Sequence, residues 1–154
     1  RVTIDLDART NPVAVLEQTL QVPVNATGES VSRQEVTVSL NSVRFETQLQ
    51  GDTTADAGTE YAVVDLTTVN DSGEKRSLGE PHLMVAKDGA GNVYARHSVT
   101  ETLDGAYPET GSLSPGESRR GKTAYGIPEG RSPLYWVFEF SEWGAGNKSF
   151  WQLR

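Results

Sequence analysis

Apolar residues alternate with polar ones along most of the chain, at the two-residue spacing typical of half-buried β-strands. Val36, Val38 and Leu40 follow this alternation, and Val43 and Phe45 continue it one position out of phase. A change of phase inside one strand indicates a β-bulge, because one extra residue is inserted on that strand. We therefore predict a long, bulged strand in this region.

Residues 61–69 are apolar on both faces in their first half, which is typical of a central strand that is covered on both sides. Near the end of the chain, residues 134–140 again alternate between apolar and polar or mixed positions. We expect the inward side chains of these two strands to face each other across the core. They are Ala62, Val64 and Leu66 on the first strand and Trp136 and Phe138 on the second.

Turn residues interrupt the strands at short intervals, as they do in an antiparallel sandwich. Residues 87–92 contain two glycines and predict a hairpin between two short strands, whereas residues 49–59 form a polar stretch without any period. Residues 114–117 read Ser-Pro-Gly-Glu, and we expect Gly116 to have a positive φ there. The chain is therefore predicted to be all-β, an antiparallel sandwich with one core.

The first residues are ambiguous. Val2, Ile4 and Leu6 alternate as in a strand, whereas Asn11 and Pro12 would suit the start of a short helix. We divide the chain into an N-terminal strand-capable extension, residues 1–27, and a sandwich domain, residues 28–154. Since the sequence begins without Met or a signal peptide, we expect a mature or trimmed form, and any signal or membrane anchor would precede Arg1.

Charge and composition limit the classes of partner that we expect for this chain. The formal net charge is −7, from 21 acidic and 14 basic residues, and the basic residues are not clustered. Nucleic acid is therefore an unexpected partner, because phosphate binding needs clustered Lys and Arg. No apolar run approaches the roughly 20 residues that cross a bilayer, so we expect no membrane insertion by this chain. The chain has no cysteine, which excludes disulfides and thiolate metal ligands and favours a prokaryotic source.

An ordered series of short segments resembles the DUF4352 family of telokin-like, immunoglobulin-fold secreted proteins. The segments are residues 28–30, 35–44, 61–70, 88–94, 113–117, 121–128 and 134–138. The resemblance covers about residues 28–140 and implies an immunoglobulin-like sandwich in an exported lipoprotein or secreted protein, with no shared catalytic residues. The strand-capable segment before residue 28 departs from the family pattern, in which many members have a low-complexity linker.

Few residues suggest a catalytic or metal-binding site. His82 and His97 are the only histidines, and neither lies in a nucleophile motif. A metal shared by both histidines with Glu80 or Asp88 lacks the close spacing of transition-metal ligands, and the hairpin at Asp88 has too few carboxylates for calcium. Asp52, Asp56 and Glu60 are better explained as a solvated loop. We predict no catalytic residues, no metal site and no cofactor.

Two groups of residues remain as candidate sites. Asn25, Asn70 and Asn147 each begin an Asn-X-Ser/Thr sequence in a predicted turn, loop or chain end, and are candidate glycosylation acceptors. Trp143, Phe150 and Trp151 lie near glycines beyond the last clear alternation. They are either an exposed surface that meets a partner or, for Phe150 and Trp151, one more strand that closes the sandwich.

We therefore expect a non-catalytic, extracytoplasmic module, secreted or anchored at the cell surface, that binds a protein partner or itself. An alternative is a subunit of an extracellular filament, in which the N-terminal segment completes a neighbour's sheet. An enzyme or a metal-handling protein is the third interpretation.

Overall fold

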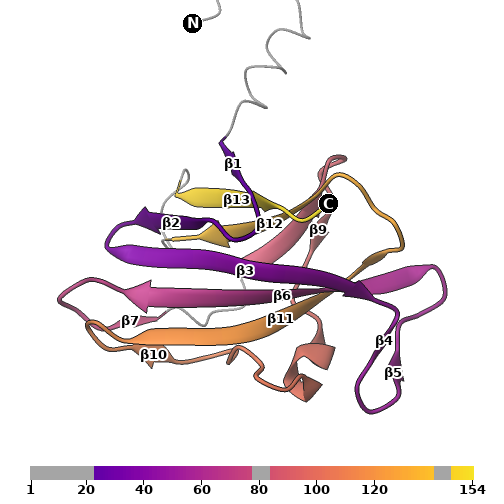
Figure 1. Ribbon diagram of the computed structural model, residues 1–154, viewed down its shortest axis with the longest axis horizontal. Helices are drawn as coiled ribbons and strands as arrows, with labels where there is room; N and C mark the ends of the chain where they lie inside the picture. The colour runs from indigo at the N-terminus through magenta and orange to yellow at the C-terminus, as the bar shows by residue number, and fades with distance from the viewer. Residues whose placement is uncertain (1–22, 78–83, 141–146) are drawn as a thin grey trace, which may run out of the picture.

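The computed structural model describes residues 23–77, 84–140 and 147–154, and two sheets pack face to face in it (Figure 1). The first sheet has the order β1 (Val24–Asn25), β13 (Lys148–Gln152), β12 (Leu134–Glu139), β8 (Met84–Asp88), β9 (Val93–Tyr94). The second has the order β11 (Ser118–Pro128), β6 (Thr59–Asn70), β3 (Val36–Glu46), β2 (Ser30–Arg33). The predicted all-β sandwich is confirmed.

Short elements complete the described fold. They are the hairpin of β4 (Gln48–Leu49) and β5 (Thr53–Thr54), the pair of β7 (Arg76–Ser77) and β10 (Ser112–Leu113), and the 3-10 helix η2 (Ser98–Thr102). The hairpin spans residues 48–54 and overlaps residues 49–59, where the sequence predicts a polar loop without any period. The predictions for residues 1–22, and those for His82 and Trp143, lie outside the described residues.

The core lies between the two sheets, with the side chains that the alternation predicted. Ala62, Val64 and Leu66 of β6 are fully buried and share one cluster with Trp136 and Phe138 of β12. Hydrogen bonds also link the two sheets: the Trp136 Nε1–H donates to the hydroxyl of Tyr125 on β11 at 2.8 Å, and the Arg33 Nε–H of β2 donates to the Ser149 hydroxyl of β13 at 2.9 Å. The two sheets are thus joined by apolar contact and by side-chain hydrogen bonds.

The bulge in β3 is also confirmed. The register with β6 shifts between Leu40 and Ser42, so that Asn41 is the extra residue. Its side-chain amide lies across β6 and donates to the Asp65 carboxylate and to the Thr67 hydroxyl, both at 2.9 Å. The bulge therefore keeps the inward alternation of both halves of β3 on the core side and adds a polar contact on the outer face.

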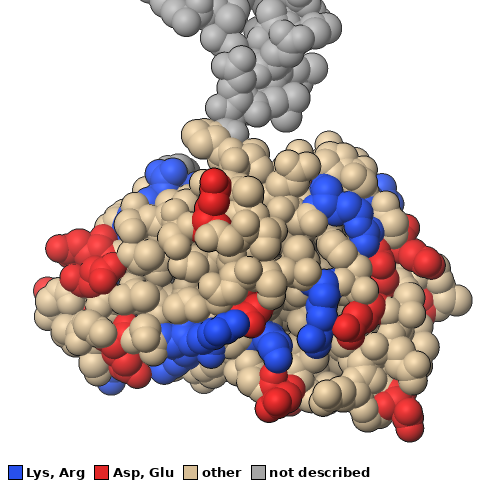
Figure 2. Space-filling model, viewed as in Figure 1, with Lys and Arg blue, Asp and Glu red and all other residues tan. Residues whose placement is uncertain are grey.

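Strand β6 is covered on both faces, as predicted. Its second face packs Tyr61 and Val63 against Leu49 of β4, Val99 of η2 and Ala124 of β11. Elsewhere the outer face of this sheet is polar. Acidic and basic side chains are intermixed over the face shown in Figure 2, and Arg120 binds the Asp65 carboxylate with two hydrogen bonds of 3.0 Å.

The C-terminal aromatic residues require a correction. Trp151 does not belong to an exposed surface, because it is fully buried on β13, with its ring centroid 5.1 Å from that of Trp136. Its Nε1–H donates to the Glu29 carbonyl at 3.0 Å. Two-residue alternation on β13 turns Ser149 and Trp151 inward and leaves Phe150 half-buried on the outer side. The alternative of one more closing strand is the correct interpretation for these two residues.

Candidate functional site

A groove lies beside the point where the chain leaves β9 and enters η2. Its volume is about 550 Å³. The described residues that line it are Val85, Ala95, Arg96, His97, Ser98, Glu101 and Glu109. They come from three separate stretches of the sequence, and the fold brings them together because the chain after β9 moves from the first sheet to the second.

That crossing is fixed by backbone pairing. Arg96 forms a bridge with Tyr125 of β11, and the His97 N–H donates to the Ala124 carbonyl at 2.8 Å. The two sheets are therefore connected on this side of the sandwich, next to the edge strands β9 and β11. The same step places residues 95–98 at the surface, where they form one wall of the groove.

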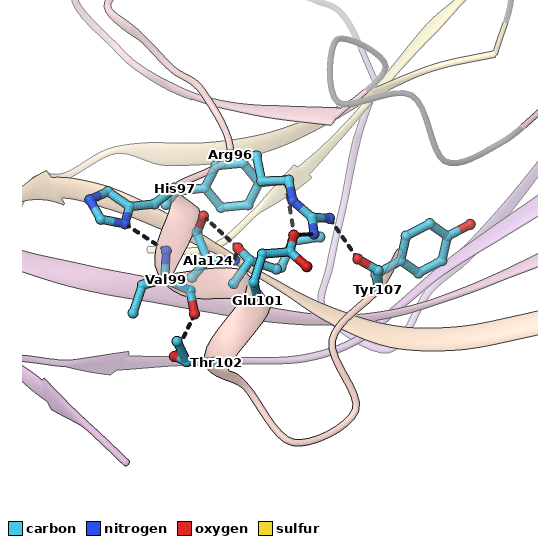
Figure 3. Close-up of polar contacts among 10 residues, drawn as sticks. Arg96, His97, Val99, Glu101, Thr102, Tyr107 and Ala124 are labelled. Atoms are coloured by element: carbon cyan, nitrogen blue, oxygen red, sulfur yellow. Dashed lines mark hydrogen bonds and ion pairs between the residues drawn. The ribbon is translucent and has the colours of Figure 1, made fainter. Parts of the chain in front are cut away.

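Arg96 forms the buried floor of the groove, since its side chain is only 8% exposed. Its Nη1 donates to the Tyr107 carbonyl at 2.7 Å, and its Nη2 binds the carboxylate of Glu101, whose side chain is 57% exposed (Figure 3). A buried guanidinium needs such partners, because an unpaired charge is costly away from water. The ion pair ties the far end of η2 to the strand that precedes it.

His97 caps η2 and faces the groove from the exposed side. Its Nδ1 accepts a hydrogen bond from the Val99 N–H at 3.1 Å, so that Nε2 is the nitrogen left to carry the proton (Figure 3). The ring meets Tyr61 edge-on, with centroids 5.2 Å apart. Gly126 leaves room for it, since a Cβ there would lie 3.2 Å from the His97 Cδ2.

Helix η2 is held against β11 by Thr100. The Thr100 hydroxyl is buried and accepts a hydrogen bond from the Ala124 N–H at 2.9 Å. At the end of the helix the Thr102 hydroxyl donates to the Val99 carbonyl at 2.7 Å. Because its backbone and side-chain polar groups are paired in this way, η2 presents a fixed rather than an adaptable wall.

Among the described residues that line the groove, Val85 and Ala95 are apolar, and two acidic residues outnumber one arginine. Val85 and Ala95 supply apolar surface, and the charge of Arg96 is balanced by Glu101. Glu109 is exposed and forms no ion pair or hydrogen bond with any residue in the described part of the chain. One carboxylate of the lining set is therefore left without a basic partner.

An apolar row on the outer face of the first sheet leads to the groove. The strand register aligns Val24 with Phe150, Phe150 with Val137, and Val137 with Val85. Val24 is 46% exposed, Phe150 and Val85 are half-buried, and Val137 is buried. The register thus connects Phe150, one of the predicted interaction residues, with the lining of the groove.

Asp88 has a structural role in its hairpin. Its carboxylate accepts hydrogen bonds from the backbone N–H of Ala90 and Asn92, from the Asn92 side chain and from the Tyr94 hydroxyl, at 2.8–3.0 Å. These bonds, first of all that from the Asn92 side chain, lower the pKa of Asp88 from 3.8 to about 2 against the opposing effect of burial. Both oxygens are thus engaged by the protein's own donors.

The other predicted acidic cluster is dispersed. Glu60 is buried rather than solvated, because it accepts hydrogen bonds from the Gly130 N–H at 2.9 Å and from Arg154 at 2.5 Å. Asp52 and Asp56 are exposed. Among residues 23–77, 84–140 and 147–154, no group of three or more His, Asp or Glu side chains is arranged to hold a metal ion.

The three glycosylation candidates differ in access. Asn70 is fully buried: its amide donates to the carbonyls of Glu74 and Leu113, and its oxygen accepts from Ser72. It is therefore not an acceptor in the folded protein, which corrects that prediction. Asn25 is half-buried and donates to the Phe150 carbonyl at 2.9 Å, and Asn147 is also half-buried.

No periodic pattern in the sequence indicates the groove. Residues 95–109 follow neither a two-residue nor a helical period, so their partners on β11 and around Tyr107 could not be inferred from spacing. The one available signal was the density of polar and charged residues, Arg96, His97, Glu101 and Glu109, directly after a strand. Placing them together requires the long-range bridge to Tyr125.

Comparisons with known proteins agree on the family and the fold. A family model described as "Domain of unknown function (DUF4352)" matches residues 25–148. No curated protein matches the chain. No helix in the described part of the chain is both long and apolar enough to span a membrane.

Solved structures with the same architecture come from several bacteria. The yjhA protein of Bacillus subtilis is 17% identical, with a TM-score of 0.62 over 85% of this chain and 100% of that one. The ycdA protein of the same species, described as a putative lipoprotein, is 10% identical, with a TM-score of 0.58 over 80% of this chain and 37% of that one. MPT63, a secreted protein of Mycobacterium tuberculosis, is 12% identical, with a TM-score of 0.54 over 86% of this chain and 98% of that one.

Proposed function

We propose that this chain, which belongs to the DUF4352 family, is a non-catalytic module that works outside the cytoplasm and binds another protein through the groove at Arg96. The observation that carries the proposal is the groove itself. It combines apolar walls, a buried guanidinium bound by Glu101 and the Tyr107 carbonyl, and an exposed carboxylate without a partner among the described residues. Mixed apolar and charged surfaces of this kind are typical of protein-binding sites.

Export is supported by the descriptions of two solved structures with the same fold. One solved structure of the same fold is called a putative lipoprotein and another a secreted protein. A secreted domain or one held at the cell surface by a preceding anchor would both suit these observations.

Binding is favoured over catalysis by the way polar groups are used. His97, the histidine that lines the groove, uses Nδ1 to cap η2 and is not hydrogen-bonded to a hydroxyl nucleophile in the described residues. The groove's buried cation is held by Glu101 and by a backbone carbonyl. These contacts stabilise the shape of the groove and leave no nucleophile and base in contact there.

The proposal is tested by photocrosslinking in the organism that produces the protein. A photoreactive amino acid placed at Ser98, on the groove rim, should yield a crosslinked protein in the extracytoplasmic fraction. The same residue placed at Thr54, which is exposed on β5 outside the groove, serves as the control. The proposal fails if the two positions give the same crosslinks, if excess unlabelled protein does not compete, or if the protein is found in the cytoplasm.

The alternative of a filament subunit is favoured by one observation at the other edge of the first sheet. Strand β1 contains two residues and pairs in parallel with β13, and Val24 is 46% exposed. Short parallel pairing contributes little stability, so another copy's strand could replace β1. Denaturant-resistant ladders on gels would support this alternative, whereas a monomer by light scattering at micromolar concentration would count against it.

A further inference from the structure

We propose that the groove at Arg96 receives an extended segment of the partner protein in which a Lys or Arg is flanked by apolar residues. This inference rests on the proposed function, because it names the chemistry of the partner at that same site. It follows from the charge balance of the groove, from the nature of its walls and from the way Arg96 is already bound.

The balance of charges in the groove favours a cationic side chain on the partner. Among the lining residues, Arg96 and Glu101 neutralise each other, while Glu109 has no basic partner in the described part of the chain. Both carboxylates are exposed at the rim, where an incoming ammonium or guanidinium group can reach them. Complementary charges at a rim fix register and speed association, even where each pair adds little affinity.

The apolar walls of the groove favour apolar residues on both sides of that cationic side chain in the partner. Val85 and Ala95 line the groove with apolar surface. Lys and Arg have long aliphatic stems that pack on apolar surface while their charged ends reach a polar rim. A basic side chain between two apolar residues therefore matches both features of the groove.

An anionic ligand is disfavoured by the same geometry. The Arg96 side chain is only 8% exposed and already donates to the Tyr107 carbonyl and to Glu101. A carboxylate or phosphate would have to displace Glu101 and would also approach Glu109. Like charges brought together at a binding surface are repulsive, so this exchange gains nothing.

Amide chemical-shift titrations of the ¹⁵N-labelled protein test the inference with three defined probes. They are acetyl-Leu-Arg-Leu-amide, the same peptide with norleucine at the centre, and the same peptide with glutamate there. The arginine peptide should shift the amides of residues 95–98 and 109. It should bind roughly two- to fivefold more tightly than the norleucine peptide, the range expected for one exposed ion pair.

Matched variants separate the rim charge from general electrostatics. Glu109→Gln should weaken the arginine peptide roughly two- to fivefold and leave the norleucine peptide unchanged. Glu35→Gln makes the same charge change at the exposed turn between β2 and β3 and should alter neither. Equal binding of the arginine and norleucine peptides, or shifts confined to residues outside the groove, would overturn the inference. Groove-specific crosslinking to a partner without a basic residue at the contact would overturn it while leaving the proposed function intact.

Discussion

At the scale of single residues, polar side chains do structural work that the sequence does not reveal. Asn70 was interpreted as a glycan acceptor in a turn, yet its amide holds the carbonyls of Glu74 and Leu113 inside the protein. The Asn-X-Ser pattern describes three adjacent residues only and carries no information about Leu113. Burial of this kind is decided by tertiary contacts, so no local motif could have predicted it.

Gly116 shows the opposite case, because its conformation follows from its immediate neighbours. A Pro-Gly pair in the central positions of a tight turn favours a type II geometry, in which the glycine has a positive φ. The observed φ is 76°, and the Glu117 N–H donates to the Ser114 carbonyl at 3.0 Å. The prediction was confirmed because every determinant lies within four consecutive residues.

Asp88→Asn should make stability depend less on pH. Because the pKa of Asp88 is lowered from 3.8 to about 2 in the folded protein, its contribution is fully present above about pH 4 and is lost as the pH falls towards 2. Asparagine also replaces an acceptor oxygen with an amide that cannot accept from Asn92 or Tyr94. Melting temperatures measured between pH 2 and pH 6 should show the wild type above the variant at pH 5, with the gap narrowing below pH 4.

The control for this measurement is Asp52→Asn, which changes the same charge on an exposed residue. Its melting temperature should follow the wild type across the whole range. A gap between wild type and Asp88→Asn that stays constant from pH 6 to pH 2 would show that the hydrogen bonds to the ionised carboxylate are not the source of stability.

At the scale of elements, alternation predicted strands well where both neighbours in the sheet are strands. The bulged β3 and the central β6 were predicted with their inward residues, because burial on each face imposes the two-residue period. Strand β11 runs from Ser118 to Pro128. It begins with the polar residues Ser118, Arg119 and Arg120, which do not follow the alternation although they pair with β6.

The β2–β3 hairpin has a turn whose residues do not suit its geometry. Gln34 and Glu35 have φ values of 50° and 60°, so both central positions lie in the left-handed region. Such two-residue turns favour Asn-Gly, because residues with bulky side chains are strained there. The double substitution Gln34→Asn and Glu35→Gly should therefore raise the free energy of unfolding by about 1 kcal/mol or more.

Chemical denaturation measures this change, and Gln34→Ala is the matched control, since alanine does not relieve the left-handed conformation. The Asp71 N–H donates to the Glu35 carbonyl at 2.8 Å, and glycine retains that backbone acceptor. A double variant no more stable than the wild type would mean that the turn carries no strain at these two positions.

At the scale of the whole molecule, the sandwich class could be predicted from the sequence, but the pairings that close the sandwich could not. Turn spacing and alternation indicate antiparallel strands, but the crossing from β9 to β11 at Arg96 and the parallel pairing of β1 with β13 join residues far apart in sequence. The groove is a product of that crossing. The polar residues that line the groove can be recognised in the sequence, but only the folded protein brings them together.

Whether a residue of the last strand faces the core or the outside determines how its variants should behave. Trp151 is fully buried against Trp136, and Phe150 faces outward and is half-buried. Trp151→Ala should therefore lower the free energy of unfolding by about 3–5 kcal/mol, a large share of the roughly 5–15 kcal/mol of a typical domain. Phe150→Ala on the same strand should cost about 1–2 kcal/mol.

Denaturant unfolding of the two variants decides between a core and a surface role for this end of the chain. Because Trp151 supports both sheets through Trp136 and Glu29, its loss should also weaken any binding at the groove in proportion to the fraction unfolded. Phe150→Ala should stay folded and would report on the apolar row alone. If instead Phe150→Ala proved the more destabilising change, the inward and outward faces of β13 would be exchanged, and the closure of the sandwich described above would be wrong.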